Sequence, residues 1–394
     1  FDDVLKKGTL PDRYRPTVYD FIAHEALAFY TSGEQAAAKP QDAFRIPADS
    51  PIFGEAEEFI NWRPDTGDTN SPAYKAVVLF QQLLRFHQED ADPTAFVDVN
   101  IERLVYGKNV AIGENKNERF KAALRAVAER WNKHELAALA LFHVANTLRE
   151  EDDLVAAHQL ANSTAIDYRN TNGGQLCLSL VSEIEAKSAR IITERVWNTP
   201  AATIQVRYKN VERVYFRAIP YDWSAFVNKH RRMPEYLDDK QRQEVLDSKA
   251  TLEWSHPLPA TSDFKERTVT FDAPTRLKPG SYFIVASHRQ DFAEKANQLS
   301  ITDVWMSDLA FIIRPREQFM EGFVLQANSG EPIKGARVDG WYQDYRQNRL
   351  VAIEPVQTDA NGMFQLKLQQ GQNYIFRARD GEQEIGARHQ VYPR

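Results

Sequence analysis

The chain has 394 residues, with 49 basic and 55 acidic side chains and a formal net charge of −6. This length is sufficient for two or three domains with buried cores. The slightly acidic balance, without a strong basic patch, argues against nucleic-acid binding. No uninterrupted apolar run approaches the roughly 20 residues that a membrane-spanning helix needs. Because the chain begins at Phe1 rather than at a methionine, we expect a processed product or a fragment.

The first 195 residues show mainly helical periodicity. Proline at an expected first helical turn, or a capping residue before it, marks three helix starts, near Pro16, Ser71 and Asp92. Small residues at facing positions of 136–168 resemble a tetratricopeptide (TPR) hairpin, in which two helices pack closely. We therefore expect a stack of antiparallel helical hairpins. Its later helices are predicted over about 115–133, 134–149, 152–168 and 174–193.

The chain has a single cysteine, Cys177, in an apolar segment. A lone cysteine excludes an intrachain disulfide and any zinc site built from several cysteines. Its apolar neighbours predict a buried and unreactive thiol.

From Thr203 onward the apolar period becomes two, which predicts short strands separated by turns and favours a β-sandwich. The charged segment 224–249 interrupts the strands and is compatible with helix, so we expect it to pack outside the sandwich. Leu299–Ile313 is predicted to supply two more strands of the same sandwich. Arg314-Pro315-Arg316 has the composition of a hinge into a last β module.

The most informative stretch is 328–368, where two polar turns are each followed by alternating apolar residues. The turns are Ser329–Pro332 and Asp359–Gly362, and the alternation is clearest over Met363–Leu368. Asn and Gly close tight hairpins at low cost because they tolerate positive φ. This pattern predicts a small antiparallel module of immunoglobulin-like type.

Several patterns begin like catalytic or ligand-binding motifs and then fail at the next required residue. His24-Glu25 and His134-Glu135 start a zinc helix, but alanine stands where the second histidine is needed. Gly330 and Gly335 have phosphate-loop spacing without its lysine, and the Asp359 turn lacks the later carboxylates of a calcium loop. No G-x-S-x-G motif is present. The sequence therefore predicts no catalytic, cofactor-binding or metal-binding residue.

Two groups of side chains remain as candidates for binding. Trp223, Trp254, Trp305 and Trp341 could stack on sugars, although tryptophans on alternating strands favour a core position. The basic segment 229–233, with Lys240 and Arg242 nearby, is either a solvated helical face or a docking surface for an acidic partner.

Five segments of the second half resemble domains of the bacterial α2-macroglobulin family. They are Tyr208–Asn210 with Val214–Arg217, Leu277–Ser287, Val304–Ala310, Ser329–Val338, and Thr358–Phe364 with its D-x-x-G-x-F turn. The helical half is similar to the helical N-terminal region that some Bacteroidetes members carry ahead of these domains. The resemblance implies a multidomain α plus β fold. It would consist of a TPR-like helical domain over 1–195, a macroglobulin-type β-sandwich over 196–316 with a helical excursion at 224–249, and a small immunoglobulin-like or macroglobulin-type β-sandwich over 317–394.

The family resemblance also implies a role. Its members are large secreted or envelope proteins that trap proteases, and many carry a thioester made from Cys-x-Glu-Gln. Here 33–35 and 381–383 read Gly-Glu-Gln without the cysteine, so no thioester residue carries over. We expect a non-enzymatic structural part of such an inhibitor, without cofactors, placed in the periplasm, on the outer membrane or outside the cell. Its expected partners are other domains of the same chain and, for the full-length protein, trapped proteases.

Two non-enzymatic alternatives remain open. The first is a cell-surface module that binds glycan or peptide through exposed tryptophans. The second is a helical adaptor that holds a partner protein in a groove within residues 70–190. An enzyme would need a cleft with paired carboxylates or clustered histidines.

Overall fold

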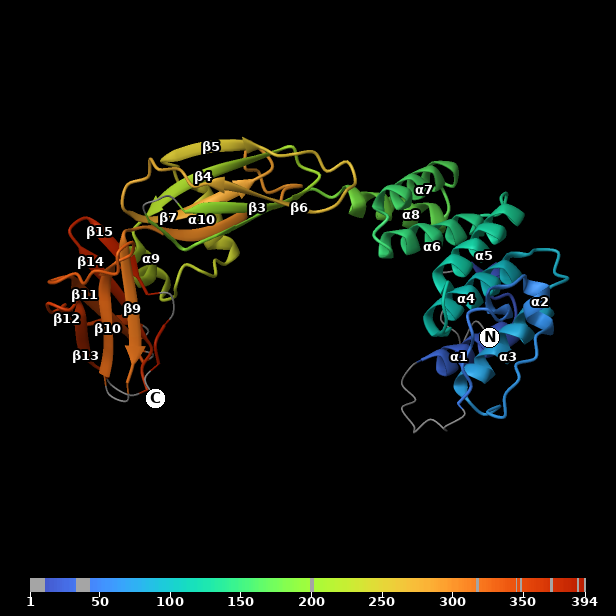
Figure 1. The fold of residues 1–394 in the computed structure, drawn as a ribbon. Coiled ribbons are helices and arrows are strands. Elements are labelled where there is room, and N and C mark those ends of the chain that lie inside the picture. Colours follow the sequence, from blue (N-terminus) through green and yellow to red (C-terminus); the bar gives the residue numbers. More distant parts are fainter. Residues whose placement is uncertain are drawn as a thin grey trace. The chain divides into compact units, whose positions relative to one another are not determined.

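The computed structural model describes residues 11–32, 43–198, 202–316, 319–344, 346–347, 349–368, 371–387 and 390–392. The chain divides into two compact units, Phe1–Glu185 and Ala186–Arg394. The first is helical and the second is built mainly from strands, so the predicted multidomain α plus β fold is confirmed (Figure 1).

The helical unit is a series of helices in which chain neighbours pack against each other, as the predicted hairpins require. Its elements are η1 (Asp12–Tyr14), α1 (Val18–Thr31), η2 (Pro51–Phe53), α2 (Ala56–Asn61), α3 (Pro72–His87), α4 (Thr94–Val110), α5 (Lys116–Arg130), α6 (Leu136–Glu150), α7 (Leu154–Asp167) and α8 (Asn172–Glu185). None of the helices in the described ranges combines the length and the apolar character that crossing a bilayer requires.

Capping side chains begin several of these helices. Thr17 and Asp20 form a reciprocal capping box at α1, and Ser71 accepts a hydrogen bond from the backbone N–H of Tyr74 ahead of α3. Pro72 fits the first turn of α3 because its missing N–H would have no helical partner there. The three predicted helix starts thus lie within two residues of the observed ones.

The last predicted helix is too long. Residues 174–193 were expected to be helical, but α8 ends at Glu185 and Ser188–Thr193 forms strand β1. Ile191 and Ile192 are β-branched, and the strand alternates between buried and exposed residues where it pairs with β3. The helical unit therefore ends before the predicted boundary at 195.

The first β-sandwich packs a three-stranded sheet, in the order β1-β3-β6, against a five-stranded sheet, in the order β2-β8-β7-β4-β5. The strands β2 and β8 run parallel, and the other strand pairs of these two sheets are antiparallel. The strands are β1 (Ser188–Thr193), β2 (Val196–Trp197), β3 (Thr203–Lys209), β4 (Arg213–Tyr221), β5 (Leu252–Pro257), β6 (Arg267–Asp272), β7 (Gly280–Ser287) and β8 (Ser300–Met306).

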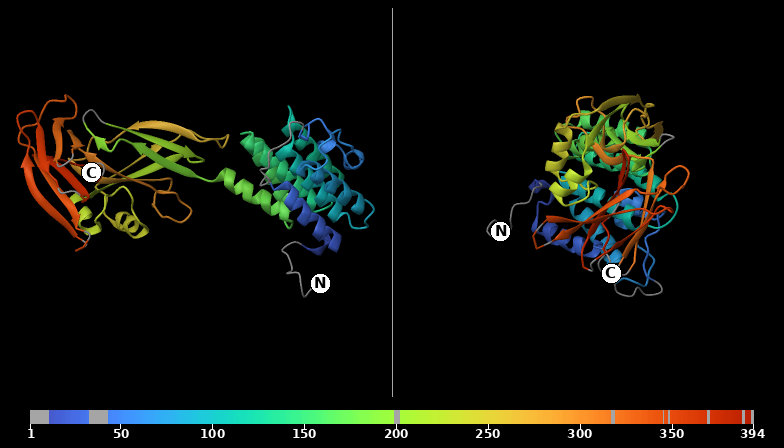
Figure 2. Two further views of the ribbon diagram at one scale, coloured as in Figure 1. Left: turned by 90° about the horizontal axis from the view of Figure 1, so that it is seen from below. Right: turned by 90° about the vertical axis from the view of Figure 1, so that its left-hand side faces the viewer.

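The excursion between β4 and β5 contains two helices, α9 (Trp223–His230) and α10 (Asp239–Asp247). They lie against the outer face of the five-stranded sheet (Figure 2). Val245 of α10 belongs to a small core there with Ile219, Phe283 and Val285.

The second β-sandwich packs the sheet β13-β10-β9 against the sheet β12-β11-β14-β15. Its strands are β9 (Leu309–Pro315), β10 (Phe319–Gln326), β11 (Arg337–Asp344), β12 (Arg349–Gln357), β13 (Met363–Lys367), β14 (Tyr374–Asp380) and β15 (Gln383–Gly386). The prediction that the Asp359 turn closes a hairpin is wrong, because the turn joins β12 to β13, which lie in different sheets. The Asp359 carboxylate accepts the backbone N–H groups of Asn361 and Met363 and so stabilises the turn locally. Gly362 in this turn has φ +70°, so the predicted positive φ of the glycine is confirmed.

The predicted hinge at Arg314-Pro315-Arg316 is wrong. Arg314 and Pro315 lie in β9, where they are paired with Glu321 and Met320 of β10. The preceding strand β8 belongs to the first sandwich, so the chain crosses between sandwiches at Ser307 and Asp308. The prediction that both strands of 299–313 belong to one sandwich is therefore also wrong, because β8 and β9 lie in different sandwiches.

Arg103 of α4 is a fully buried charge at the centre of the helical unit, with 1% of its surface exposed. Its guanidinium donates hydrogen bonds to the side-chain oxygen of Asn100 and to the carbonyl oxygens of Pro51, Ile52 and Gly54, at 2.7–3.1 Å. No carboxylate in the described ranges contacts it, and burial lowers its pKa to about 9. Arg103 therefore ties the η2 turn to α4.

Replacing Arg103 with methionine keeps an unbranched side chain but leaves these buried oxygens without donors. We expect Arg103→Met to lower the free energy of unfolding by about 3 kcal/mol, measured by urea denaturation followed at 222 nm. The matched control is Arg119→Met, at an exposed position of α5. Equal effects of the two substitutions would contradict this role for Arg103.

Candidate functional site

The most distinctive local structure is the junction between the two β-sandwiches, where three tryptophans meet. Trp223 of α9 is 1% exposed. Its ring centroid lies 5.8 Å from that of Trp305 in β8 and 6.1 Å from that of Trp341 in β11. The first two belong to the first sandwich with its excursion, and Trp341 belongs to the second.

Local structure explains how Trp223 reaches this position. The Asp222 side chain accepts the backbone N–H of Ala225 at 2.9 Å, which caps α9 and starts the helix at Trp223. Gly386 of β15 lies against the ring, and a Cβ there would be 2.8 Å from atoms of both Trp223 and Trp305. The close approach of strand and indole rings therefore requires glycine at 386.

The junction is part of one continuous apolar core. Trp223, Val227, Met233 and Trp305 pack in the same cluster as the buried residues of the second sandwich. A polar contact supports it, because the side-chain oxygen of Gln383 accepts the backbone N–H of Asp308 at the crossover. The two sandwiches accordingly form a single compact unit.

A second feature is a cleft of about 480 Å³ between the excursion and the first sandwich. Arg195 lies in it and forms ion pairs with Glu235 of the excursion and Asp303 of β8. Burial raises the pKa of Asp303 although Arg195 opposes that shift. The arrangement holds two carboxylates on one guanidinium, so it ties the excursion to the sheet and leaves no free acid–base pair here.

The basic segment of the excursion is largely neutralised within the excursion itself. Lys229 forms an ion pair with Glu244 at 2.7 Å, and Arg232 forms one with Asp238 at 2.8 Å. Such exposed pairs contribute little to stability. The structure therefore favours the solvated helical face over the acidic-partner surface for residues 229–233.

The two histidine motifs are separate and each is committed to protein contacts. Nδ1 of His24 lies 3.3 Å from Oε2 of Glu102, and Nε2 of His134 lies 3.1 Å from the hydroxyl oxygen of Thr94. Across the described ranges, no group of three His, Cys, Asp or Glu side chains has metal-binding geometry. Cys177 is buried, as the sequence predicted, and burial raises the pKa of its thiol to about 12. The thiol is therefore protonated and unreactive at neutral pH.

One of the two Gly-Glu-Gln segments, 381–383, lies within the described residues. Residues 33–35 lie outside the described ranges. At the other segment, Gly381 forms the turn before β15, and Gln383 makes the contact with Asp308.

The tryptophans do not form the flat exposed platform that a sugar-binding module would need. Trp223 is buried and its ring is inclined by 59° to that of Trp341. Trp254 lies elsewhere, stacked on Phe216 with centroids 5.0 Å apart. The core interpretation therefore holds for Trp223, and the glycan alternative gains no support.

The helical unit contains a cavity of about 250 Å³ between α4, α5 and the η2 turn. Phe96, Trp131 and Arg103 line it, which places it partly in the range predicted for an adaptor groove. However, the Arg103 guanidinium is fully used by protein oxygens. The cavity thus lacks the unpaired polar wall that the adaptor alternative predicted at this position.

Asp98 of α4 is a buried carboxyl in the same unit. Burial raises its pKa to about 7, and Glu102 adds to the rise, whereas His24 and Arg15 oppose it. The folded protein therefore keeps this proton to a higher pH than the unfolded chain does. Between about pH 4 and 7 the folded state binds more protons, so the stability contributed by this group falls as pH rises.

Asp98→Asn removes this titration while preserving side-chain volume. At pH 8 we expect the variant to unfold with a free energy about 2 kcal/mol above that of the wild type, with a smaller difference at pH 5. Urea denaturation at the two pH values measures both. Glu129→Gln, at an exposed position of α5, is the control. A gain that is the same at both pH values would contradict the assignment to Asp98.

Comparison with known proteins finds no matching family model and no matching curated protein sequence. Solved structures do match. A crystal structure of native alpha-2-macroglobulin from Escherichia coli spanning domains MG0-NIE-MG1 is 15% identical over 51% of this chain and 64% of that chain, with a TM-score of 0.39. The chain thus spans less than two thirds of that fragment.

Two further structures of the same Escherichia coli protein match over 51% of this chain. A fragment spanning domains NIE-MG1 is 16% identical over 95% of its own length, with a TM-score of 0.37. The native conformation determined by cryo-electron microscopy is 18% identical over 12% of its length, with a TM-score of 0.31. All three matching structures are of an alpha-2-macroglobulin from Escherichia coli.

Proposed function

We propose that the chain is a non-enzymatic structural part of an α2-macroglobulin-like protein that traps proteases in the bacterial envelope. The observation that carries the proposal is the shared core of the two β-sandwiches, centred on Trp223 and Gly386. A trap must hold its modules at set positions around a protease, and a continuous apolar junction does this more firmly than a polar linker. The order of macroglobulin-like motifs in the sequence supports the same role.

The side-chain chemistry of the described residues is compatible with this role. The carboxylates of the 480 Å³ cleft are paired with Arg195, and the thiol of Cys177 is buried. The ion pairs of Arg195 and the buried thiol of Cys177 both contribute to structure. Proteases as targets and an envelope location belong to the proposal and come from the family resemblance.

A substitution at Gly386 tests the junction. Gly386→Ala places a Cβ against two rigid indole rings, so we expect a loss of about 1–3 kcal/mol in unfolding free energy and a change in the near-UV circular dichroism of the tryptophans. The control is Gly67→Ala, where a Cβ would meet nothing within 4 Å. An unchanged spectrum and unchanged stability for Gly386→Ala would show that the junction is not closely packed.

Protease trapping is tested with the protein in its natural full length. After incubation with trypsin, we expect cleavage of a small chromogenic peptide to persist while cleavage of intact casein is strongly reduced. The physical reason is that an enclosed protease admits small molecules and excludes large ones. Equal activity on both substrates, whether retained or lost, would contradict trapping.

A further inference from the structure

Three arginines gather on the outward face of the sheet β12-β11-β14-β15. Arg337 of β11 pairs in register with Arg379 of β14, and Asp339 pairs with Arg377. On the next strand, Glu384 of β15 lies opposite Arg379. Residues that face each other across neighbouring strands project to the same side of a sheet. Five charged side chains, called here the arginine cluster, therefore share one face.

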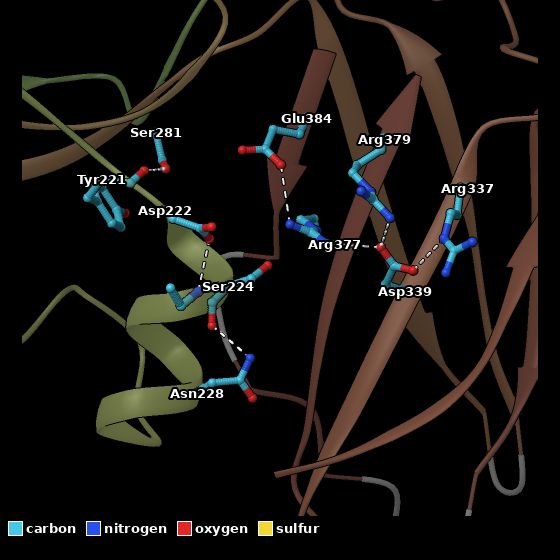
Figure 3. Close-up of polar contacts among 11 residues, drawn as sticks. Tyr221, Asp222, Ser224, Asn228, Ser281, Arg337, Asp339, Arg377, Arg379 and Glu384 are labelled. Carbon is cyan, nitrogen blue, oxygen red and sulfur yellow. Dashed lines mark hydrogen bonds and ion pairs between the residues drawn. The ribbon is translucent and has the colours of Figure 1, made fainter. Parts of the chain in front are cut away.

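Asp339 holds this cluster together (Figure 3). Its Oδ1 atom lies 2.7 Å from Nε of Arg337, and its Oδ2 atom lies 3.2 Å from Nη2 of Arg377 and 3.0 Å from Nη2 of Arg379. Burial works to raise the pKa of Asp339, but the three guanidinium groups outweigh it and hold the pKa below its usual range. Asp339 is thus a permanent anion at the centre of the cluster.

The cluster carries more positive charge and more donors than its own carboxylates can use. Among the described residues, Asp339 and Glu384 are the acids that form ion pairs with these arginines, and Glu384 does so through a 3.3 Å contact with Arg377. Three cations therefore face two anions. A guanidinium has more N–H donors than these contacts occupy. Among the described residues, the Nε atoms of Arg377 and Arg379 are buried without an acceptor.

The two outer arginines are accessible. The side chains of Arg337 and Arg379 are 53% and 40% exposed, whereas Asp339 is 9% exposed. Arg337 makes its ion pair with Asp339 through Nε (Figure 3). The guanidinium groups of Arg337 and Arg379 therefore present N–H donors to solvent, and the carboxylate of Asp339 that pairs with them is less exposed.

The same face changes character along its strands. Toward Trp341 it is apolar and is covered by Trp223 of α9, and Arg377 lies 5.5 Å over the Trp341 ring. Figure 3 shows α9 on one side of Arg377, and Asp339, Arg379 and Arg337 on the other side. Asp222, the acid at the start of α9, is used in capping that helix. The basic end of the face is therefore available to a partner.

We propose that the arginine cluster is a docking site for an acidic peptide segment presented by a partner protein. A guanidinium matches the planar geometry of a carboxylate and can bind it through two parallel hydrogen bonds. Asp339 and Glu384 lie among the arginines and would repel a dense polyanion, such as a sulfated glycan, more than a short segment with a few carboxylates. The chain's net charge of −6 likewise repels a dense polyanion more than a short segment with a few carboxylates.

Binding is measured with the whole chain by fluorescence anisotropy. The probe is a fluorescein-labelled peptide with consecutive glutamates flanked by glycine and serine, and a matched peptide carries glutamines instead. We expect the glutamate peptide to bind, the glutamine peptide not to bind, and the affinity to fall as salt rises. The test is independent of protease trapping, because it uses no protease.

The double variant Arg337→Gln with Arg379→Gln should weaken binding of the glutamate peptide at least about fivefold. Arg349→Gln is the matched control, since Arg349 is an exposed arginine of the same sheet at the far end of β11 and β12. It should change the affinity less than about twofold. Near-UV circular dichroism confirms that each variant is folded.

If the double variant Arg337→Gln with Arg379→Gln fails to fold, the double variant Arg337→Lys with Arg379→Lys replaces it. It keeps the charge and loses the paired hydrogen bonds, so we expect a smaller but measurable loss of affinity. The proposal is overturned if the wild type does not bind the glutamate peptide, or if Arg349→Gln weakens binding as much as the cluster variants do. Binding of a heparin fragment in the absence of peptide binding would also overturn it.

Discussion

The packing of Trp223 against Gly386 is the contact on which the arrangement of the β unit depends. A glycine in β15 lets the strand backbone approach the indole rings of Trp223 and Trp305 more closely than any other residue would permit. This approach joins the apolar cores of both sandwiches into one cluster. Val227 and Met233 of the excursion belong to the same cluster, so the excursion and the second sandwich share one core around this contact.

Much of the secondary structure follows from local sequence, and the arrangement of the strands does not. The capped helix starts and the Asp359 turn depend on neighbouring residues, so a local pattern is sufficient to predict them. The strand β9 is different. The residues of Leu309–Pro315 alone do not predict whether this strand pairs with β10 or with β8. The pairing depends on the partner strands and on the burial of Leu309 in the core of the second sandwich.

The junction was missed for a related reason. Trp223 and Trp341 were recognised as core candidates, but Gly386 has no motif around it, and 163 residues separate it from Trp223 in the sequence. A glycine that is needed because a side chain packs against the backbone cannot be recognised from its neighbours in the sequence. A glycine that is needed for positive φ can be, because it lies in a turn with a typical sequence. The pairing of arginines around Asp339 is equally invisible, because it depends on the register of β11 and β14.

The two ion networks of the β unit act in different ways on either side of this core. Arg195 satisfies two carboxylates at once and joins the excursion to β8, so removing it would leave both acids without their cation. Partly buried pairs of this kind add little net stability compared with apolar contacts, but they are costly to break and so favour one arrangement over others. At the arginine cluster the balance is reversed, with cations in excess over one buried aspartate. The first network therefore has no cation left to offer an acidic partner, whereas the second has, and this difference in charge balance separates a structural tie from a binding surface.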